Sequence, residues 1–364
     1  FKHAAFERSA SDSIFVKCSS DDEVFGFGES LPREYVTGEN SRQAYNLLQT
    51  KILPALVGRS FSSFEECNQF FFDCDGMAPS ECNLSRDTPQ TAAWCAVELS
   101  LLDCFGKIFK QSFFTRQADN NSLHYSGVLP ADRGFKLLKA LLRLKFYGIK
   151  NVKIKLGRKF HLSDLAMSRR ILGKDADIRI DANMAWAKQE ALDNIKKISR
   201  FNINCFEQPL AADNLIESAE LLKQTDALIM ADESFNTAQS LKDIIDKKAF
   251  NAVNVRISKC GGYLASLKRC QTAIKEGLVV QLGSQVGESS LLSAANLALL
   301  LKLPGIRYAE GCFGLYLLKE DPCAPLMQFG YAGMPPKAPY GYGLGIQVDE
   351  KKLKLYSKDH ALVG

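Results

Sequence analysis

The sequence has only four histidines, and its eleven cysteines include no Cys-x-x-Cys pair. An odd number of cysteines spread through a large chain is typical of reduced thiols in the cytosol. A zinc site is disfavoured for the five cysteines between residues 67 and 104, because their spacings are irregular and no histidine lies among them. We therefore predict a cytoplasmic protein whose chemistry does not depend on zinc.

Long apolar runs are also missing: no segment approaches the roughly 20 uncharged apolar residues that a membrane span needs. The chain starts at Phe1 without a basic segment followed by an apolar one, so no signal peptide is visible, and the native N-terminus can extend before Phe1. The net charge is a modest +5, and the basic residues are scattered rather than clustered with aromatic ones. These features exclude a membrane role and disfavour nucleic-acid binding.

The length of 364 residues exceeds what one hydrophobic core usually organises. Near its start, the β-rich segments Phe15–Cys18 and Val24–Phe27 flank an acidic turn and predict a hairpin. Apolar residues at helical spacing follow, for example over Ala92–Phe105. We predict an α+β module over residues 1–122, a barrel over 123–322, and a C-terminal segment over 323–364 that returns to the first module.

From about Leu123 onward, short apolar runs alternate with amphipathic stretches, the pattern of parallel βαβ units. The predicted strands are Tyr125–Val128, Asn151–Lys155, Ile178–Asp181, Cys205–Glu207, Leu228–Asp232, Ala252–Arg256, Leu278–Leu282 and Arg307–Ala309. The predicted helices are Gly134–Phe146, Ser163–Leu172, Lys188–Phe201, Asn214–Gln224, Ala238–Lys247, Tyr263–Glu276 and Leu291–Leu301. Eight such strands predict an α/β fold of the TIM-barrel type, a (β/α)8 barrel.

Polar residues recur at nearly constant intervals at or after the ends of these apolar runs. The intervals are 26 residues from Lys155 to Asp181, 26 to Glu207, 25 to Asp232 and 27 to Lys259. In a barrel of parallel strands, residues at the C-terminal strand ends converge on one mouth. The spacing therefore predicts three carboxylates, flanked by lysines, around a common centre.

Three carboxylates suit a hard divalent cation, because they supply oxygen ligands and leave positions open for substrate and water. None of the histidines falls at a core strand end, which favours Mg²⁺, with Mn²⁺ possible, over zinc. We predict Asp181, Glu207 and Asp232 as metal ligands. The alternative is that each acid only caps the helix that follows it.

The lysines predict proton transfer. An ammonium group near other cations has a lowered pKa and can serve as a base near neutral pH. The predicted strands place Lys155 and Lys259 on opposite sides of the mouth, so that a substrate between them could lose a proton to one and gain it from the other. Lys153 shares the strand face of Lys155 and would add positive charge. Together these groups predict abstraction of a proton α to a carboxylate, with the enediolate stabilised by metal and lysine charge.

These phrases resemble the enolase superfamily, specifically its muconate-lactonizing-enzyme subgroup, over nearly the whole chain. The matching phrases are Gly26-Phe27-Gly28-Glu29, Lys153-Ile154-Lys155-Leu156-Gly157, Asp181-Ala182-Asn183, Glu207-Gln208-Pro209, Ala231-Asp232-Glu233-Ser234 and Ser258-Lys259-Cys260-Gly261-Gly262. The resemblance implies a modified (β/α)7β barrel with an N-terminal capping domain, an essential Mg²⁺ and a homo-oligomer. It also implies the three metal ligands above, with Lys155 and Lys259 as the acid/base pair.

The resemblance leaves the substrate open. Similar enzymes include muconate cycloisomerases, o-succinylbenzoate synthases, N-succinylamino-acid racemases and dipeptide epimerases. The mandelate-racemase subgroup carries a histidine base on strand seven, where this chain has Gly283-Ser284-Gln285, so that branch is disfavoured. Further candidates around the substrate or behind the catalytic groups are Asn183, Glu233, Ser284, Gln285, Glu310 and Arg33.

Arg33 or Arg158 is a candidate for gripping a distal carboxylate, since a guanidinium pairs with one bidentately. The first residues near Lys2 and His3 are expected to contribute to the cap. The sequence thus predicts an Mg²⁺-dependent isomerase of a small carboxylate, either a cycloisomerase or a racemase or epimerase. The alternatives are a lyase of the o-succinylbenzoate-synthase type and a barrel that binds ligands without catalysis.

Overall fold

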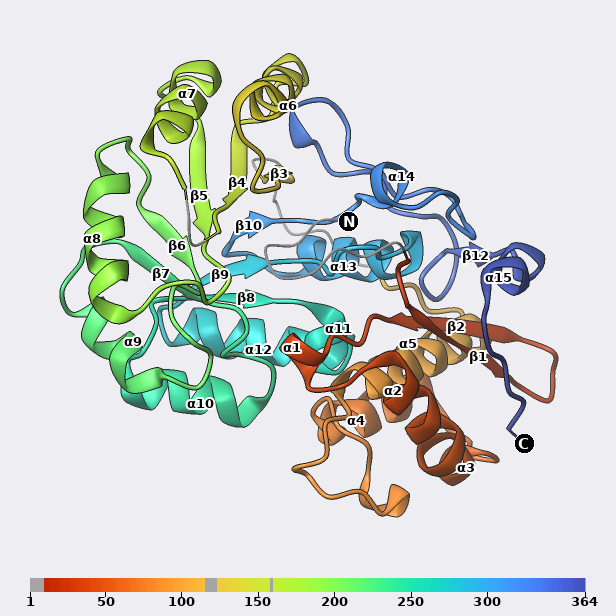
Figure 1. The fold of residues 1–364 in the computed structure, drawn as a ribbon. Coiled ribbons are helices and arrows are strands. Elements are labelled where there is room, and N and C mark those ends of the chain that lie inside the picture. Colours follow the sequence, from red (N-terminus) through yellow and green to blue (C-terminus); the bar gives the residue numbers. More distant parts are fainter. Residues whose placement is uncertain (1–9, 115–122, 158–159, 364) are drawn as a thin grey trace.

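The computed structural model describes residues 10–114, 123–157 and 160–363 (Figure 1). A curled parallel sheet with helices on its outer side forms the larger part, and a smaller α+β part lies beside it. No helix in these residues has the length and apolar character needed to cross a lipid bilayer.

The sheet contains eight strands in the order β10-β9-β8-β7-β6-β5-β4-β3, each parallel to its neighbour. A parallel bridge between Tyr125 and Ala309, with Ser126 N donating to Ala309 O at 2.8 Å, joins the two ends and closes the barrel. The strands are β3 (Gly127–Leu129), β4 (Asn151–Lys155), β5 (Asp177–Asp181), β6 (Cys205–Glu207), β7 (Leu228–Ala231), β8 (Ala252–Val255), β9 (Val279–Leu282) and β10 (Ile306–Ala309). All eight predicted strands are present, and the barrel prediction is confirmed.

Seven βα units precede the last strand, which gives the (β/α)7β order that the resemblance implied. The barrel helices are α6 (Gly134–Phe146), α7 (Leu162–Leu172), α8 (Lys188–Ser199), α9 (Leu215–Leu222), α10 (Ala238–Lys247), α11 (Ile257–Cys260), α12 (Tyr263–Lys275) and α13 (Ser290–Lys302), and the short helix α14 (Gly314–Leu317) follows the last strand. The short helix α11 was not predicted. It inserts one turn between β8 and α12, and this turn carries Lys259.

The N-terminal part pairs an antiparallel hairpin with helices. Its elements are β1 (Ile14–Ser19), β2 (Phe25–Ser30), α1 (Glu34–Thr37), α2 (Ser41–Leu47), η1 (Leu48–Ile52), α3 (Leu53–Leu56), α4 (Phe64–Cys74), η2 (Ser80–Cys82) and α5 (Thr91–Ile108). Strand β2 packs so closely on α5 that only glycine fits at two positions. A Cβ atom at Gly28 would lie 2.0 Å from Ala96 O, and one at Gly26 would lie 2.1 Å from Ser100 O. The Gly-x-Gly phrase therefore serves strand-on-helix packing.

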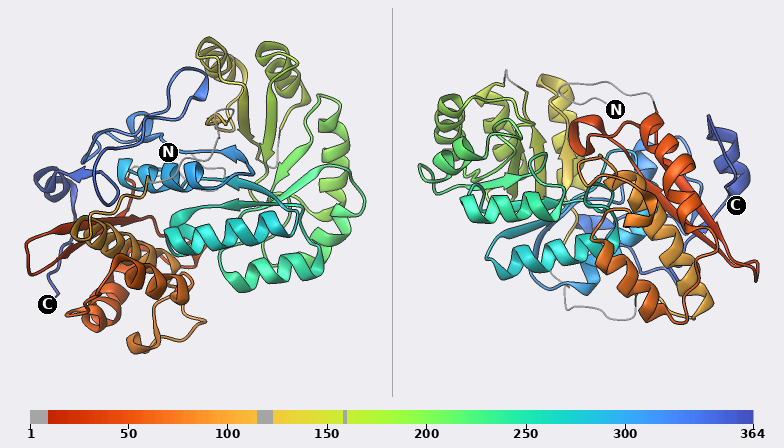
Figure 2. Two further views of the ribbon diagram at one scale, coloured as in Figure 1. Left: turned by 180° about the vertical axis from the view of Figure 1, so that it is seen from behind. Right: turned by 90° about the horizontal axis from the view of Figure 1, so that it is seen from below.

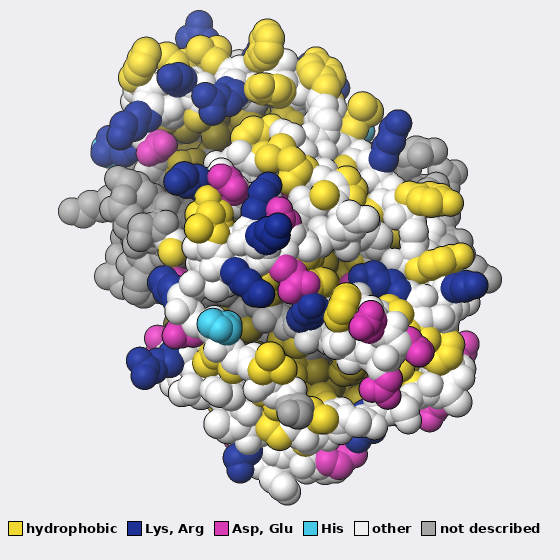
Figure 3. Space-filling view, turned by 90° about the vertical axis from the view of Figure 1, so that its right-hand side faces the viewer, with side chains coloured by type: hydrophobic (Ala, Val, Ile, Leu, Met, Phe, Trp, Pro, Cys, Tyr) yellow, Lys and Arg dark blue, Asp and Glu magenta, His cyan; other side chains and the backbone are white. Residues whose placement is uncertain are grey.

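The last elements of the chain run along the barrel, where Tyr125 N donates to Gly333 O at 2.7 Å, and then return to the hairpin (Figures 1 and 2). They are β11 (Cys323–Ala324), η3 (Tyr331–Gly333), β12 (Gln347–Val348) and α15 (Glu350–Tyr356). Leu344 N donates to Asp103 Oδ1 at 2.8 Å, and Lys17 pairs with Glu350 at 2.8 Å. On the face in Figure 3, basic and acidic side chains occur together across the middle, so neither charge dominates there.

Two buried carboxylates join the N-terminal part to the barrel. Glu29 of β2 accepts Ser289 N at 3.1 Å at the start of α13, and Glu98 of α5 accepts Leu264 N at 3.0 Å at the start of α12. Burial raises the pKa of each carboxyl to about 8, against the opposing effect of these donors. Because barrel helices begin at the C-terminal ends of the strands, these contacts dock the smaller part at the mouth of the barrel.

Candidate active site

The three predicted carboxylates stand at the ends of adjacent strands. Asp181 closes β5 and is the register partner of Glu207, which closes β6. Asp232 follows β7, and its backbone N–H donates to Gln208 Oε1 at 2.9 Å. All three side chains are almost completely buried. The structure thus brings together groups that lie about 25 residues apart in sequence, as the strand spacing predicted.

Lys153 is a buried counterion for this acidic cluster. Its Nζ lies 2.7 Å from Glu310 Oε2, 3.2 Å from Glu207 Oε2 and 3.8 Å from Asp181 Oδ2. Burial acts to lower its pKa, but the carboxylates of Glu207 and Glu310 outweigh burial and raise the pKa above its usual value. Lys153 is therefore positively charged at neutral pH.

Glu207 accepts hydrogen bonds from two buried side-chain amides. Asn254 Nδ2 donates to Oε1 at 2.8 Å, and Gln281 Nε2 donates to Oε2 at 3.2 Å. Burial acts to raise the pKa of Glu207, yet the charges of Lys153 and Arg256 overcome it and lower the pKa to about 2. The carboxylate is consequently ionised at any physiological pH.

Lys155 stands nearer the opening. Its Nζ lies 3.2 Å from Asp181 Oδ2 and 3.4 Å from Asn183 Oδ1, and 14% of its side chain is exposed. The Lys153 side chain, two residues earlier on β4, is only 4% exposed. Of these two lysines, Lys155 is the one placed to reach a bound substrate.

Lys259 lies deeper than the sequence predicted. Its Nζ donates to Asn254 O at 2.7 Å, to Asp232 O at 2.8 Å and to Asp232 Oδ1 at 3.0 Å, and the side chain is fully buried. Burial lowers its pKa to about 7. These contacts hold Asp232 and the end of β8 in place. The role of Lys259 as acid/base partner stays a prediction.

Arg256 is a site residue that the sequence analysis did not single out. It follows β8 directly, and its guanidinium forms an ion pair with Asp232, lies 3.8 Å from Glu207 and donates from NH1 to Gln285 Oε1 at 3.0 Å. The sequence did contain an indication of this role, because the predicted strand Ala252–Arg256 ends at Arg256. Residues two apart on a strand share a face, so Arg256 lies on the same face as Asn254, which donates a hydrogen bond to Glu207.

The remaining candidates fall into two groups. Asn183 Nδ2 donates to Glu233 Oε1 at 3.4 Å, and burial, followed by the Asp181 charge, raises the pKa of Glu233 to about 7. Glu310 bridges Lys153 and Arg179, whose NH2 lies 3.0 Å from it. These residues surround the carboxylates.

The other candidates lie at the edge of the site or beyond it. Ser284 is half-buried just past β9, and Gln285 is buried beside it. Arg33 is buried and donates to Ser11 O at 2.7 Å and Val286 O at 3.1 Å, so it links the N-terminal part to the barrel. Arg158, Lys2 and His3 lie outside the described residues.

The three carboxylates are paired with cationic side chains in this structure. Within residues 10–114, 123–157 and 160–363, no group of three or more His, Cys, Asp or Glu side chains lies in a metal-holding arrangement. The cause is visible: the acids face Lys153, Lys155, Arg256 and Lys259. The donor chemistry nevertheless fits Mg²⁺, because Asp181 Oδ2 is buried and, among the described residues, has ion-pair contacts with Lys155 and Lys153 but accepts no hydrogen bond of good geometry.

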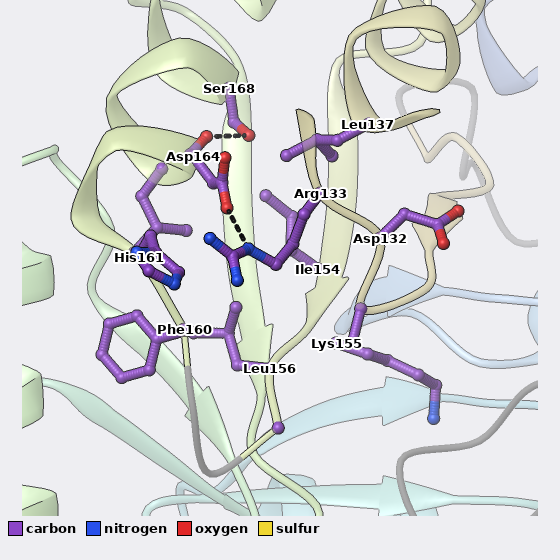
Figure 4. Close-up of a pocket in the computed structure, with 13 residues that line it drawn as sticks. Asp132, Arg133, Leu137, Ile154, Lys155, Leu156, Phe160, His161, Asp164 and Ser168 are labelled. Atoms are coloured by element: carbon purple, nitrogen blue, oxygen red, sulfur yellow. Dashed lines mark hydrogen bonds and ion pairs between the residues drawn. The ribbon is translucent and has the colours of Figure 1, made fainter. Parts of the chain in front are cut away.

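A small cavity lies next to Lys155, on the side of α6 and α7 (Figure 4). Its volume is about 30 Å³, which is space for about one water molecule. The ion pair between Arg133 and Asp164 lies inside it, and the Lys155 ammonium points away from it. This cavity is too small for a carboxylate substrate, and the mouth of the barrel remains the candidate site.

Comparison with known proteins agrees with this geometry. The enolase C-terminal domain-like family matches residues 136–352. The chain is 27% identical over 291 residues to the N-succinyl-L-Arg/Lys racemase of Bacillus cereus, covering 78% of this chain and 75% of that protein.

Two solved structures have the same fold. A dipeptide epimerase from Cytophaga hutchinsonii, complexed with Mg and the dipeptide D-Ala-L-Val, superposes with a TM-score of 0.82 at 20% identity, covering 94% of this chain and 90% of that one. A muconate lactonizing enzyme from Mycobacterium smegmatis superposes with a TM-score of 0.82 at 21% identity, covering 95% of each chain. With the family match over more than half of its length, the chain belongs to the enolase superfamily, in the muconate-lactonizing-enzyme subgroup.

Proposed function

We propose that this protein is an enzyme that removes a proton α to the carboxylate of a small substrate and completes an isomerisation, either a cycloisomerisation or a racemisation or epimerisation. The observation that supports it most is the placement of Lys155, whose partly exposed ammonium stands beside a cluster of three buried carboxylates. A lysine at that rim can reach a substrate, whereas Lys153 below it cannot.

The chemistry divides between the two lysines of β4. In its neutral form, Lys155 takes the α-proton, and the electron pair of the broken C–H bond moves onto the substrate carboxylate oxygens. Lys153 is held in place by Glu207 and Glu310, so its charge contributes a fixed positive potential beneath the site. Return of the proton from Lys155, or its use elsewhere in the product, completes the reaction.

A divalent cation fits this proposal. Asp181, Glu207 and Asp232 would hold Mg²⁺, with Mn²⁺ possible, because hard cations prefer carboxylate oxygens. When bound, the cation would supply positive charge to the oxygens on which the substrate anion develops. Since Arg256 pairs with Asp232 in this structure, Mg²⁺ and the guanidinium compete for the same carboxylate.

A second candidate is β-elimination by a lyase of the o-succinylbenzoate-synthase type. It begins with the same proton abstraction, so the cluster around Lys155 serves both reactions. The two differ in whether the substrate carries a leaving group β to the carboxylate, and the products distinguish them.

Exchange of α-protons in D₂O tests the proposal. The probes are N-succinyl-arginine, N-succinyl-lysine, L-Ala-L-Glu, a muconate and the o-succinylbenzoate precursor, each with Mg²⁺, followed by mass spectrometry and product analysis. We expect deuterium incorporation or product with one probe class, lost in Lys155→Ala and kept in the exposed control Lys150→Ala. Exchange that persists in Lys155→Ala would refute the assigned base, and absence of any reaction would favour a binding protein.

A further inference from the structure

We propose that the outer face of helix α6 is a docking surface for an anionic phospholipid membrane. This face combines an apolar stripe with flanking basic side chains, and the inference does not depend on the proposed reaction. No helix in the described residues is suited to crossing a bilayer, but a helix that lies in the lipid interface need not cross it. The prediction of no membrane role is thereby limited to spanning.

Helix α6 has two apolar faces. Leu137 and Leu141 are buried in the hydrophobic core. On the opposite side, Phe135 and Phe146 are 79% and 80% exposed, and Leu142 is half exposed. Their spacings of seven and four residues place these three side chains on one side of an α-helix. The outer stripe therefore takes no part in the core of the barrel.

The stripe continues past the end of α6. Tyr147 is exposed, and its ring centroid lies 5.9 Å from that of Phe146. Tyr331, from the segment after the last strand, is also exposed, and a Cβ atom at Gly148 would lie 2.8 Å from its ring. These side chains form one surface, which we call the α6 patch: Phe135, Leu142, Phe146, Tyr147 and Tyr331.

Such exposure is unusual for this barrel. Among the described residues of helices α7 to α13, only Leu162 and Ile216 are exposed large apolar side chains. Single exposed apolar residues are normal on protein surfaces, whereas a contiguous apolar patch marks an interaction site. The α6 patch is of the second kind.

The α6 patch is flanked by positive charge. Residues 134–150 contain five basic and no acidic residues. All five are exposed, and none forms an ion pair with an acidic residue in the described part of the chain, although Arg133 just before them pairs with Asp164. Figure 3 shows yellow and dark-blue side chains together at the top of the molecule, where Figure 1 places α6 and α7. Basic residues are scattered over the chain as a whole, but here they cluster with aromatic ones: Lys136, Lys139, Arg143, Lys145 and Lys150.

An anionic lipid surface fits this combination of side chains. Lysine and arginine attract acidic headgroups, while phenylalanine and tyrosine enter the boundary between headgroups and acyl chains. A second copy of the chain fits less well, because a two-fold contact through this face would bring the positive charges of both copies together. Helix α6 stands at the outer edge of the molecule (Figures 1 and 2), so a protein partner would need a matching acidic groove, whereas a fluid bilayer adapts to a ridge.

Vesicle co-sedimentation tests the docking surface. The full chain is mixed with vesicles of phosphatidylcholine alone, or of phosphatidylcholine with phosphatidylglycerol, at low and at high salt. We expect binding to the anionic vesicles at least about tenfold stronger than to the neutral ones, and weaker at high salt because exposed charges are screened. Equal binding to both kinds of vesicle, or binding to neither, would overturn the proposal.

Two double variants assign the binding to the α6 patch and its flanks. Phe135→Ser with Phe146→Ser removes the two most exposed apolar side chains of the helix. Lys136→Glu with Lys139→Glu reverses two of the charges. We expect each double variant to weaken binding to anionic vesicles by at least about tenfold while circular dichroism stays unchanged. Wild-type binding by both folded variants would overturn the assignment.

Matched controls separate this face from general surface effects. Ile216→Ser removes an exposed apolar side chain from α9, and Lys196→Glu with Lys197→Glu reverses the same number of charges on α8. Both controls should bind anionic vesicles as wild type does. Equal weakening in the controls and in the α6 variants would show attraction by net charge alone and would overturn the proposal.

Two further measurements test the other occupants. Trp94 and Trp186 are buried, so Phe146→Trp reports on the patch, and we expect its emission to shift to the blue on anionic vesicles. Unshifted emission would contradict insertion. An oligomer that dissociates in the Phe135→Ser, Phe146→Ser variant without lipid would assign the face to a second copy. Binding to soluble polyglutamate but not to vesicles would assign it to an acidic polypeptide, and either result would overturn the lipid assignment.

Discussion

Replacing Lys153 with methionine tests the electrostatic core of the site. Methionine nearly preserves the volume of the side chain but removes the charge that lies 2.7 Å from Glu310, 3.2 Å from Glu207 and 3.8 Å from Asp181. Loss of one partner from a buried ion pair leaves an uncompensated charge and costs about 3–5 kcal/mol. Because Arg179 still contacts Glu310 and Arg256 still lies near Glu207, we expect the lower end, about 3 kcal/mol.

The measurement is urea unfolding of wild type, Lys153→Met and the control Lys150→Met at several pH values. Lys150 directly precedes the same strand but is exposed, so its replacement should change the free energy of unfolding by no more than about 0.5 kcal/mol. The loss in free energy of unfolding caused by Lys153→Met should depend on pH. In wild type the pKa of Glu207 is lowered to about 2 from 4.5, so its stabilising effect is present above pH 4.5 and is lost as pH falls through about 2.

The difference between wild type and Lys153→Met should therefore be largest near neutral pH and shrink as the solution is acidified. A variant within about 1 kcal/mol of wild type at pH 7, or a deficit that does not change between pH 7 and pH 3, would refute this account of the cluster.

Three further predictions concern the metal and the docking of the N-terminal part. Asp232→Asn should weaken Mg²⁺ binding by roughly tenfold to a hundredfold or more in calorimetry, and unchanged affinity would remove Asp232 from the ligand set. Burial raises the pKa of Glu29 to about 8 from 4.5, so wild type loses stability as pH rises through this range. As pH rises, the free energy of unfolding of Glu29→Gln should therefore increase relative to that of wild type, by at most about 1.4 kcal/mol per pH unit. A difference in unfolding free energy that does not depend on pH would contradict the raised pKa of Glu29. Gly262→Ala places a Cβ 1.7 Å from Glu98 Oε2 at φ +122°, and should cost about 2–4 kcal/mol. Gly173→Ala, at φ +93° in open space, should cost clearly less, and equal losses would argue against the clash.

The barrel and its acidic centre were predictable because they follow from local patterns. Each strand is a short apolar run, and the interval of about 26 residues repeats one strand, one helix and two loops. Parallel strands then bring Asp181, Glu207 and Asp232 to one edge, whatever the details of the loops.

The positions of the side chains that follow β8 were harder to predict from the spacing of the motifs. Lys259 was expected opposite Lys155 because its interval of 27 residues continued the series. The strand ends at Val255 and a helical turn follows, so Lys259 turns inward under Asp232 while Arg256 takes the strand-end position. A difference of three residues in a loop is invisible in the interval but determines how deeply Lys259 is buried, while its role as acid/base partner stays a prediction.

The individual side-chain contacts between the N-terminal part and the barrel could not be predicted. Glu29 and Ser289 are 260 positions apart, and nothing in either local sequence indicates that one caps the helix of the other. Arg33 looked suited to a substrate carboxylate by residue type, but it binds main-chain carbonyls of Ser11 and Val286. Such roles depend on how the N-terminal part docks on the barrel, which is a tertiary property.

The most direct test of the central claim compares α-proton exchange in D₂O between wild type and Lys155→Arg, with Mg²⁺ present and with the probe that wild type turns over. The variant keeps the positive charge beside Asp181 but removes the lone pair that accepts the proton. We expect a loss of exchange of about 10²–10⁴-fold, the usual contribution of a general base, with Mg²⁺ affinity and folding retained. Exchange in Lys155→Arg at the wild-type rate would contradict it.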